Sequence, residues 1–459
     1  MSGWLPFMKI SISGIRGIYG VDLSLHEIIR FTRLFASIIK LEGRKCVLAQ
    51  DTRPSSRVIS QTVSASLMEQ DIDVYNLDVA PTPIVFREAR KYGSGFVVTA
   101  SHNPFEWNGL KFIIKGRGIF EDELHTMLKK TAFSSESAAA TTTTTTTSST
   151  AKLGRSFDCV SGYVNEIVNF VEKSTYNRTL KLGLDLGGGA TCGYANHLFK
   201  KLGSKFYSIN DVHGVTSRGP DPTADYLNEL CMLVIANELD FGFAFDLDGD
   251  RLVVVNRMGE KLSSDATLLI CIASAINLGM KKFVTSIDTS IAVEKFIKDH
   301  GGKFDFSKVG EANVVSKMLE VDAEAGGEGS SAGFIMPKFN MCRDGFLASA
   351  IISSLDKKEI DEYLDFSSQY VQIRTKISAD SSLHRKVIEK LTDSFTAESS
   401  AVLTIDGIKA IIDDDSWILV RPSNTEHAIR ISIESKKANI QSLYKKTREK
   451  VQFTYDQIK

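Results

Sequence analysis

Short apolar runs typical of buried strands alternate with longer helix-like stretches in the first part of the chain. Residues 46–49, 73–77 and 95–99 have strand character, and residues 55–69 and 83–91 between them have helical character. Strands joined by helices at this spacing usually pair in parallel, because a crossover helix returns the chain to the same end of the sheet. The sequence therefore predicts βαβ units and a mainly parallel sheet.

The same alternation recurs twice further along, and the last part changes character to four strand-like runs flanked by two helices. A chain of 459 residues suits about three or four domains. We predict an α/β fold: three similar mixed α/β sandwich domains plus a C-terminal α+β domain around a central cleft. The predicted parts are α/β domains at residues 1–133, 153–257 and 258–365, a low-complexity Ser/Thr insertion or linker at 134–152, and an α+β domain at 366–459. The Ser/Thr insertion has too few apolar residues to offset the entropy cost of ordering, so we expect it to be flexible.

Composition excludes several classes of partner. With 55 basic and 56 acidic residues the net charge is −1, which leaves no electrostatic footprint for nucleic acid or an anionic membrane. The six cysteines form no C-x-x-C pair, which indicates free thiols in a reducing compartment. No apolar stretch is long enough to span a bilayer, and the first residues do not resemble a signal peptide. We therefore expect a cytoplasmic protein that binds a small molecule, as a monomer or a homodimer.

The strand predicted at residues 95–99 leads into the sequence T-A-S-H-N-P, and Asn103-Pro104 ends it because proline lacks an N–H group. Ser101 and His102 then follow the carboxyl end of a buried strand, which is where open α/β sheets bind ligands. Ser, Asn and Pro also favour ordinary turns, so these residues alone leave both interpretations open.

Three carboxylates follow another apolar run, in the sequence F-A-F-D-L-D-G-D-R-L at residues 243–252. Asp246, Asp248 and Asp250 repel one another unless a cation neutralises them. The spacing therefore predicts a site for a hard metal ion with oxygen ligands.

T-A-S-H-N-P at residues 99–104 and D-L-D-G-D-R at 246–251 resemble the two signature loops of the α-D-phosphohexomutases. The resemblance implies an isomerase that interconverts hexose 6-phosphate and hexose 1-phosphate through a bisphosphorylated sugar. It also implies that Ser101 is the phosphoserine, that Ser101 and the three aspartates hold one Mg²⁺ per active site, and that hexose 1,6-bisphosphate is the activator.

Four other residues acquire catalytic roles through the same resemblance. Arg16 lies in a glycine-flanked loop suited to phosphate, and Arg251 would assist phosphoryl transfer. Lys111 matches the family's candidate general base and acid. His102 would shuttle a proton or donate a hydrogen bond, and the sequence does not separate these roles.

Two further loops would bind the sugar phosphate. In G-G-E-G-S-S-A-G at residues 326–333, Glu328 and Ser330 would contact sugar hydroxyls, whereas Ala332 stands where many family members carry histidine. At Val309-Gly310-Glu311, Ala312 follows where relatives often place a basic residue. The loop R-P-S-N-T-E clusters hydroxyls, an amide and arginine in a pattern suited to an anion. Its predicted phosphate-binding residues are Arg421, Ser423, Asn424, Thr425 and Arg430.

The choice of sugar depends on the loop at residues 326–333, which is nearer the G-E-G-N-G-G type than the histidine-bearing type. We therefore predict phosphoglucosamine mutase, with phosphomannomutase or phosphoglucomutase as alternatives. Two other classes stay open: a sugar-phosphate phosphatase would need Asp246 but not Ser101, and an inactive phosphosugar-binding protein would turn nothing over.

Overall fold

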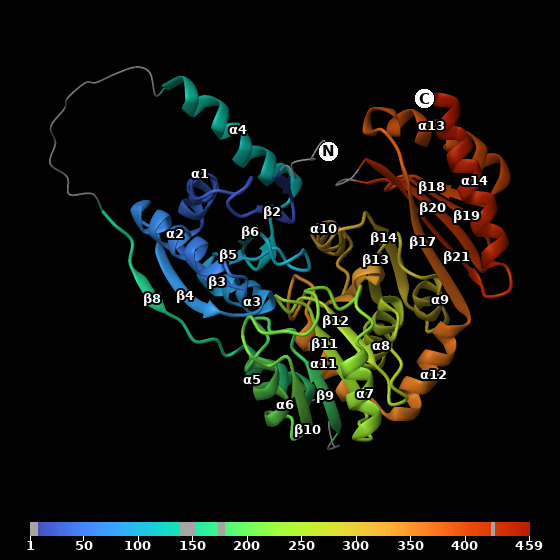
Figure 1. Cartoon of the computed structure of the whole chain (residues 1–459), viewed down its shortest axis with the longest axis horizontal. Coiled ribbons are helices and arrows are strands. Elements are labelled where there is room, and N and C mark those ends of the chain that lie inside the picture. The colour runs from blue at the N-terminus through green and yellow to red at the C-terminus, as the bar shows by residue number, and fades with distance from the viewer. Residues whose placement is uncertain (1–7, 138–151, 173–179, 424–426) are drawn as a thin grey trace. The chain divides into compact units, whose positions relative to one another are not determined.

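The computed structural model describes residues 8–137, 152–172, 180–423 and 427–459. Figure 1 labels its helices and strands in chain order. The chain divides into two compact units. The first unit comprises Met1–Leu262 and Gly333–Ser354, and the second comprises Ser263–Ala332 and Leu355–Lys459.

The first unit contains an eight-stranded sheet in the order β1-β2-β6-β5-β3-β4-β8, with β7 paired to β6. Its strands are β1 (Lys9–Ser11), β2 (Gly14–Ile18), β3 (Lys45–Gln50), β4 (Asp73–Val79), β5 (Ser94–Val98), β6 (Trp107–Ile114), β7 (Arg117–Gly118) and β8 (Ser156–Asp158). The predicted parallel pairing is confirmed among β5, β3 and β4, and β8, which was not predicted, also pairs in parallel with β4. The pairs that involve β1, β2, β6 and β7 are antiparallel, so the sheet is mixed rather than mainly parallel. The reason is the short connection from β5 to β6, which has no room for a crossover helix.

Helices cover both faces of this sheet. The helices are α1 (Leu25–Ile39), the 3₁₀ turn η1 (Lys40–Glu42), α2 (Ser56–Glu69), α3 (Thr82–Tyr92) and α4 (Glu121–Ser137). Helices α1, α2 and α4 share one hydrophobic core with β5 and β6, whereas α3 packs against β3 and β5. The predicted sandwich is therefore present. Helix α4 also includes residues 134–137, which the sequence assigns to the flexible insertion, and residues 138–151 lie outside the described part of the chain.

The rest of the first unit is a second α/β layer around the sheet β10-β9-β11-β12. Its elements are α5 (Tyr163–Glu172), β9 (Lys181–Asp185), α6 (Tyr194–Lys201), β10 (Lys205–Ile209), α7 (Asn228–Ala236), β11 (Phe241–Phe245), β12 (Leu252–Val255) and α11 (Gly345–Ser353). Strand β16 (Gly333–Ile335) also falls in the first unit but is not a strand of this sheet. Strand β11 is parallel to β9 and antiparallel to β12, so the loop between β11 and β12 reverses the chain within a few residues. That loop contains the three aspartates.

The second unit begins with a third α/β part. Strand β13 pairs in parallel with β14 on one side and with β15 on the other. The elements are α8 (Ser264–Asn277), β13 (Lys282–Ser286), α9 (Ile291–Asp299), β14 (Lys303–Ser307), α10 (Glu311–Val321), β15 (Ala325–Glu328), the 3₁₀ turn η2 (Gly329–Ser331) and α12 (Lys357–Ser368). The candidate sugar loop therefore follows a parallel strand.

The C-terminal part of the second unit is an antiparallel five-stranded sheet, β17-β21-β20-β19-β18, packed against two helices. Its elements are β17 (Tyr370–Ser378), the 3₁₀ turn η3 (Ser381–Leu383), α13 (His384–Glu398), β18 (Ala401–Leu403), β19 (Ile408–Asp413), β20 (Ser416–Pro422), β21 (Ala428–Lys436) and α14 (Ile440–Ile458). The four predicted strands are confirmed, and sequence analysis missed β17. The predicted fold class of three α/β domains and a C-terminal α+β domain is confirmed, whereas their arrangement around a cleft stays a prediction.

No helix among the described residues combines the length and the apolar character that crossing a membrane requires.

A group of three phenylalanines gives a direct test of the first core. The rings of Phe35 and Phe96 lie 5.0 Å apart in an edge-on contact, and Phe112 lies 5.4 Å from Phe96. We expect Phe96→Ala to lower the free energy of unfolding by about 3–5 kcal/mol, because it removes a buried ring and leaves a cavity. Urea unfolding measures the loss. Leu41→Ala is the control, since Leu41 is 81% exposed, and an equal loss in both variants would contradict the assigned core.

Candidate active site

The connection from β5 to β6 carries Ser101 in a strained conformation. Ser101 has φ of 51°, in the left-handed region that side chains other than glycine seldom occupy, and the residue is completely buried. Its backbone N–H donates to Thr99 Oγ1 at 2.8 Å. The surrounding structure therefore holds this serine in a conformation that it would rarely adopt alone.

The hydroxyl of Ser101 lies between a histidine and an aspartate. Ser101 Oγ is 3.3 Å from His102 Nδ1 and donates to Asp246 Oδ2 at 3.2 Å. His102 Nε2 lies 3.4 Å from Arg251 Nη2. A guanidinium group can only donate, so Nε2 accepts and the ring proton is on Nδ1, which donates to Ser101 Oγ. In this arrangement His102 orients the hydroxyl and Asp246, not His102, accepts its hydrogen.

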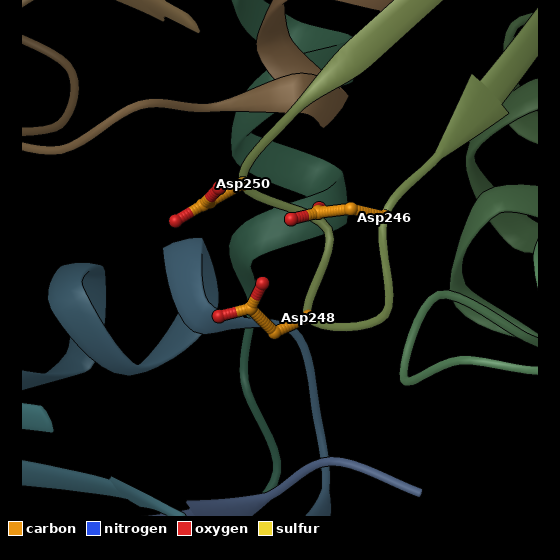
Figure 2. Close-up of side chains that lie close together, drawn as sticks. All are labelled: Asp246, Asp248 and Asp250. Carbon is orange, nitrogen blue, oxygen red and sulfur yellow. The ribbon is translucent and has the colours of Figure 1, made fainter. Parts of the chain in front are cut away.

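Three of the four predicted metal ligands, the aspartates, come from the loop between β11 and β12, and their carboxylates turn toward one another (Figure 2). One oxygen from each of Asp246, Asp248 and Asp250 lies within 4.8 Å of the others, and all three residues are completely buried. Gly249 has φ of 72°, and a Cβ atom there would lie 2.7 Å from Thr191. The glycine thus permits the tight turn that aims three carboxylates at one point.

Burial and mutual repulsion affect the aspartates unequally. Burial, followed by the charges of Asp248 and Asp250, raises the pKa of Asp246 well above its ordinary value. Burial would also raise the pKa of Asp250, but the charges of Arg343, Lys111 and Arg251 outweigh it and lower that pKa. A raised pKa favours the neutral carboxyl group at Asp246, next to Ser101, whereas Asp250 is held as a carboxylate by the cations around it.

Two carboxylate oxygens of this cluster are buried without a hydrogen-bond partner. They are Asp248 Oδ1 and Asp250 Oδ1, and no donor among the described residues reaches either of them. A buried anionic oxygen without a partner is costly, and a hard divalent cation bound by oxygen ligands would remove that cost. The donor set therefore fits the predicted metal ion.

Two of the predicted cations lie at the edge of the cluster. Lys111, on β6, donates from Nζ to Asp250 Oδ2 at 3.0 Å, and Arg16, on β2, donates to Asn103 Oδ1 at 3.2 Å. Because Asn103 belongs to the Ser101 loop, the structure brings Arg16, Ser101, His102, Lys111, Arg251 and the aspartates together within the first unit.

Sequence analysis missed two residues of this site. Arg343 donates from Nη2 to Asp250 Oδ2 at 2.7 Å, and Thr82, at the start of α3, donates from Oγ1 to Asp248 Oδ2 at 2.7 Å. The backbone N–H of Thr82 also donates to the Asp248 carbonyl at 2.8 Å. Neither residue lies in a recognisable loop sequence, and no signal in the sequence alone would have assigned them.

The candidate sugar loop lies in the second unit, where Glu328 is buried at the end of β15. Its Oε1 accepts from the Gly310 N–H at 2.7 Å, and its Oε2 accepts from Ser331 Oγ at 3.3 Å. Ser330 is partly exposed on the following turn. The backbone two residues before Ala312 therefore holds the Glu328 carboxylate. Ala332 ends the turn with φ of 51°.

The candidate phosphate loop lies between β20 and β21 in the same unit. Arg421 and Arg430 face each other in register on these strands, and Arg430 Nε donates to Ser423 Oγ at 3.3 Å. Arg421 Nη1 lies 4.0 Å from Asp406 Oδ2. The predicted residues Asn424 and Thr425 lie outside the described residues. Convergence of these two loops with Ser101 stays a prediction.

Four successive parts of the chain match sequence families. Residues 8–139 match phosphoglucomutase/phosphomannomutase alpha/beta/alpha domain I, residues 161–259 match domain II, residues 263–370 match domain III, and residues 383–447 match the C-terminal domain. The chain belongs to the phosphoglucomutase/phosphomannomutase family. The resemblance seen in the two signature loops is therefore confirmed for the chain as a whole.

Curated relatives of this family align over nearly the full chain. A protein of Methanothermobacter thermautotrophicus named probable phosphoglucosamine mutase is 30% identical over 434 residues, which cover 92% of this chain and 93% of that protein. A phosphoglucomutase/phosphomannomutase of Thermococcus kodakarensis is 30% identical over 437 residues, with the same coverage of 92% and 93%.

Solved structures of the family share the fold. A phosphoglucomutase/phosphomannomutase family protein from Burkholderia thailandensis superposes with a TM-score of 0.81 at 24% identity, covering 97% of this chain and 98% of that one. A phosphomannomutase described as putative, from Thermus thermophilus, superposes with a TM-score of 0.77 at 21% identity, covering 97% and 99%. These likenesses support the fold class of this family member.

The assigned state of His102 can be measured directly. Burial, reinforced by the charges of Arg251, Arg16 and Arg343, lowers the pKa of His102 to about 2. A lowered pKa favours the neutral ring, so we expect the Nδ1–H tautomer to persist between about pH 5 and about pH 9. Nitrogen-15 NMR of the imidazole distinguishes the states, with the signal assigned by its loss in His102→Gln. A ring that gains a proton near its ordinary pKa of about 6.5 would contradict this geometry.

Proposed function

We propose that this chain is a phosphohexomutase that exchanges a phosphoryl group between Ser101 and a hexose phosphate. One observation carries the proposal: Ser101 Oγ lies 3.2 Å from Asp246 Oδ2, at the edge of three converging carboxylates of which two have an unpartnered oxygen. A strained, buried serine beside a metal-ligand set and several cations suits phosphoryl transfer, which depends mainly on positioning and charge stabilisation.

Residues of the first unit would have separate roles in the phosphoryl transfer. The hydroxyl of a hexose phosphate attacks the phosphorus of phosphorylated Ser101, the bond between phosphorus and Ser101 Oγ breaks, and a hexose bisphosphate forms. After reorientation of the sugar, its other phosphoryl group returns to Ser101. Arg16 and Arg251 would hold the transferring phosphoryl oxygens, since guanidinium groups donate in pairs to phosphate.

Lys111 is the proposed general acid and base for the sugar hydroxyl. As the neutral amine it would accept the proton of the attacking sugar hydroxyl, and the resulting ammonium, which the ion pair with Asp250 at 3.0 Å favours, would give the proton to the leaving sugar oxygen in the return step. His102 would donate from Nδ1 to Ser101 Oγ and so orient the serine.

We propose Mg²⁺ as the ion held by Asp246, Asp248, Asp250 and Ser101. When bound, it would neutralise charge on the transferring oxygens. Hexose 1,6-bisphosphate is the proposed activator, because it would return the phosphoryl group to an unphosphorylated Ser101.

We propose glucosamine phosphate as the preferred substrate. Glu328 and Ser330 would contact the sugar hydroxyls, and Arg421, Ser423, Asn424, Thr425 and Arg430 would bind the phosphate that does not react. The loop that contains Glu328 has Ala332 at the position where many family members carry histidine. Several relatives carry the name probable phosphoglucosamine mutase. Mannose and glucose phosphates are the alternatives, since the Thermococcus kodakarensis relative is named for both activities.

The proposal is tested by incubating the protein with glucose 1,6-bisphosphate and Mg²⁺, followed by peptide mass spectrometry and turnover of glucosamine, mannose and glucose phosphates. We expect a phosphate on Ser101 and fastest turnover of glucosamine phosphate. Ser101→Ala should abolish exchange and lower the free energy of unfolding by no more than about 1–3 kcal/mol, because it takes from the buried Asp246 Oδ2 its Ser101 donor. The matched control is Ser94→Ala at the other end of β5, where Oγ donates to the Lys45 carbonyl at 2.7 Å. A phosphate on Asp246, or accumulation of free phosphate, would instead indicate a phosphatase.

Metal binding is tested separately from turnover. A ligand present at about 100 times its Kd stabilises a protein by about 2.7 kcal/mol, so Mg²⁺ should raise the midpoint of thermal unfolding. Asp248→Asn should weaken this effect at least about tenfold in Mg²⁺ concentration, because it removes a charged ligand. Asp78→Asn makes the same change at an exposed position of the first unit and should leave the Mg²⁺ effect unchanged. Equal Mg²⁺ responses in all three proteins would exclude the aspartate cluster as the site.

A further inference from the structure

Asp51 and Arg53, which follow β3, form a buried ion pair and do not cap the next helix. In the sequence, Asp51-Thr52-Arg53 stands just before a predicted helix and suggests a helix cap. The structure corrects this: Ser55 occupies the cap position of α2, and no side chain accepts a capping hydrogen bond there. The side chains of Asp51 and Arg53 are instead completely buried against each other, with Arg53 Nε 3.0 Å from Asp51 Oδ2.

Arg53 uses every donor of its guanidinium group. Nη2 donates to the carbonyl oxygens of Ser101 at 2.5 Å and Asn103 at 2.7 Å. Nη1 donates to the Trp107 carbonyl at 3.0 Å and to the carbonyl of Pro104. Nε donates to Asp51. A guanidinium has five N–H donors, and four of them here hold the backbone of one loop.

Asp51 links Arg53 to Thr99, at the start of the same loop. Its Oδ2 accepts from Thr99 Oγ1 at 2.7 Å, and Thr99 Oγ1 in turn accepts from the Ser101 N–H at 2.8 Å. Its Oδ1 accepts from Ser56 Oγ at 2.5 Å and from the Arg53 N–H at 3.1 Å. Both backbone polar groups of Ser101 are therefore bound by this pair, the carbonyl directly by Arg53 and the N–H through Thr99.

The network explains how Ser101 keeps its left-handed conformation. A serine at φ of 51° costs on the order of 1–3 kcal/mol and persists only where surrounding contacts determine it. Four carbonyl groups that point at one centre would also repel one another without a planar cation between them. Lysine could supply at most three donors from a single atom, so it cannot replace this fork.

We propose that Arg53 is a positioning residue for phosphoryl transfer: it fixes the backbone of residues 101–107, so that Ser101 Oγ is held toward Asp246. Arg53 itself touches neither the carboxylate cluster nor a reacting atom. The inference rests on the proposed function only for the role of Ser101, because the geometry of the loop is independent of activity.

The test that needs no activity is hydrogen exchange of the loop in Arg53→Lys. We expect the amides of residues 99–107 to exchange at least about tenfold faster than in the wild-type protein, since the carbonyl anchors are lost. Ile39→Ala, a buried change at the end of α1, serves as a control for general destabilisation of the same core. If both variants speed exchange of the loop equally, or if neither does, Arg53 does not hold the loop and the proposal is overturned.

The kinetic test separates positioning from binding. Misplacement of a reacting atom by about 1 Å can cost on the order of 100-fold in rate, so we expect Arg53→Lys to lower kcat by about that factor with KM changed less than about threefold. Arg30→Lys, at a partly exposed ion pair of α1, should leave both constants unchanged. Unchanged kcat in Arg53→Lys, or a rise in KM alone, would overturn the proposal. A wild-type protein without phosphoryl transfer would instead refute the proposed function, while hydrogen exchange would still decide whether Arg53 holds the loop.

Discussion

Three carboxylates forced together in a buried loop impose the main constraint on the first unit. Asp246, Asp248 and Asp250 bring three negative charges within one turn, where burial strengthens their repulsion. Positively charged side chains and hydrogen-bond donors from separate strands and helices surround the cluster and offset part of this repulsion. Lys111 and Arg343 both bind Asp250, so the cluster is balanced on one side and open on the other.

The short reversal between β5 and β6 brings the serine to the open side. Because β6 returns antiparallel beside β5, Ser101 sits at the strand end and Lys111 returns within the same sheet. A crossover helix after β5 would have separated the serine from Lys111. The site therefore depends on a mixed sheet. The antiparallel pairing of β5 and β6, which the sequence did not predict, brings Ser101 and Lys111 to the same site.

Sequence reasoning identified the residues of continuous loops that the structure brings together, and it missed residues that reach the cluster from distant parts of the chain. The loops containing Ser101 and the aspartates could be read directly, since strand ends and carboxylate spacing are local properties. Thr82 and Arg343 contribute through single side chains that only the folded chain brings near the aspartates. Strand β17, Tyr370–Ser378, was missed although its apolar residues alternate with polar ones, which is the pattern of a half-buried strand.

Arg53 is a residue whose place in the sequence suggests the wrong role, because its contacts are made to a distant loop. Its position just before a helix is typical of a cap, and only the four carbonyl groups of a loop some fifty residues away reveal its use. The loop it binds ends at β6, and the cluster that Ser101 faces is fixed by α3 through Thr82. The two loops that contain Ser101 and Asp246 are thus each held by hydrogen bonds to backbone carbonyl groups, from Arg53 in one loop and from the Thr82 N–H to Asp248 in the other. A serine that gives up one phosphoryl group and then accepts another gains from this, because neither loop has to be ordered again between the two steps.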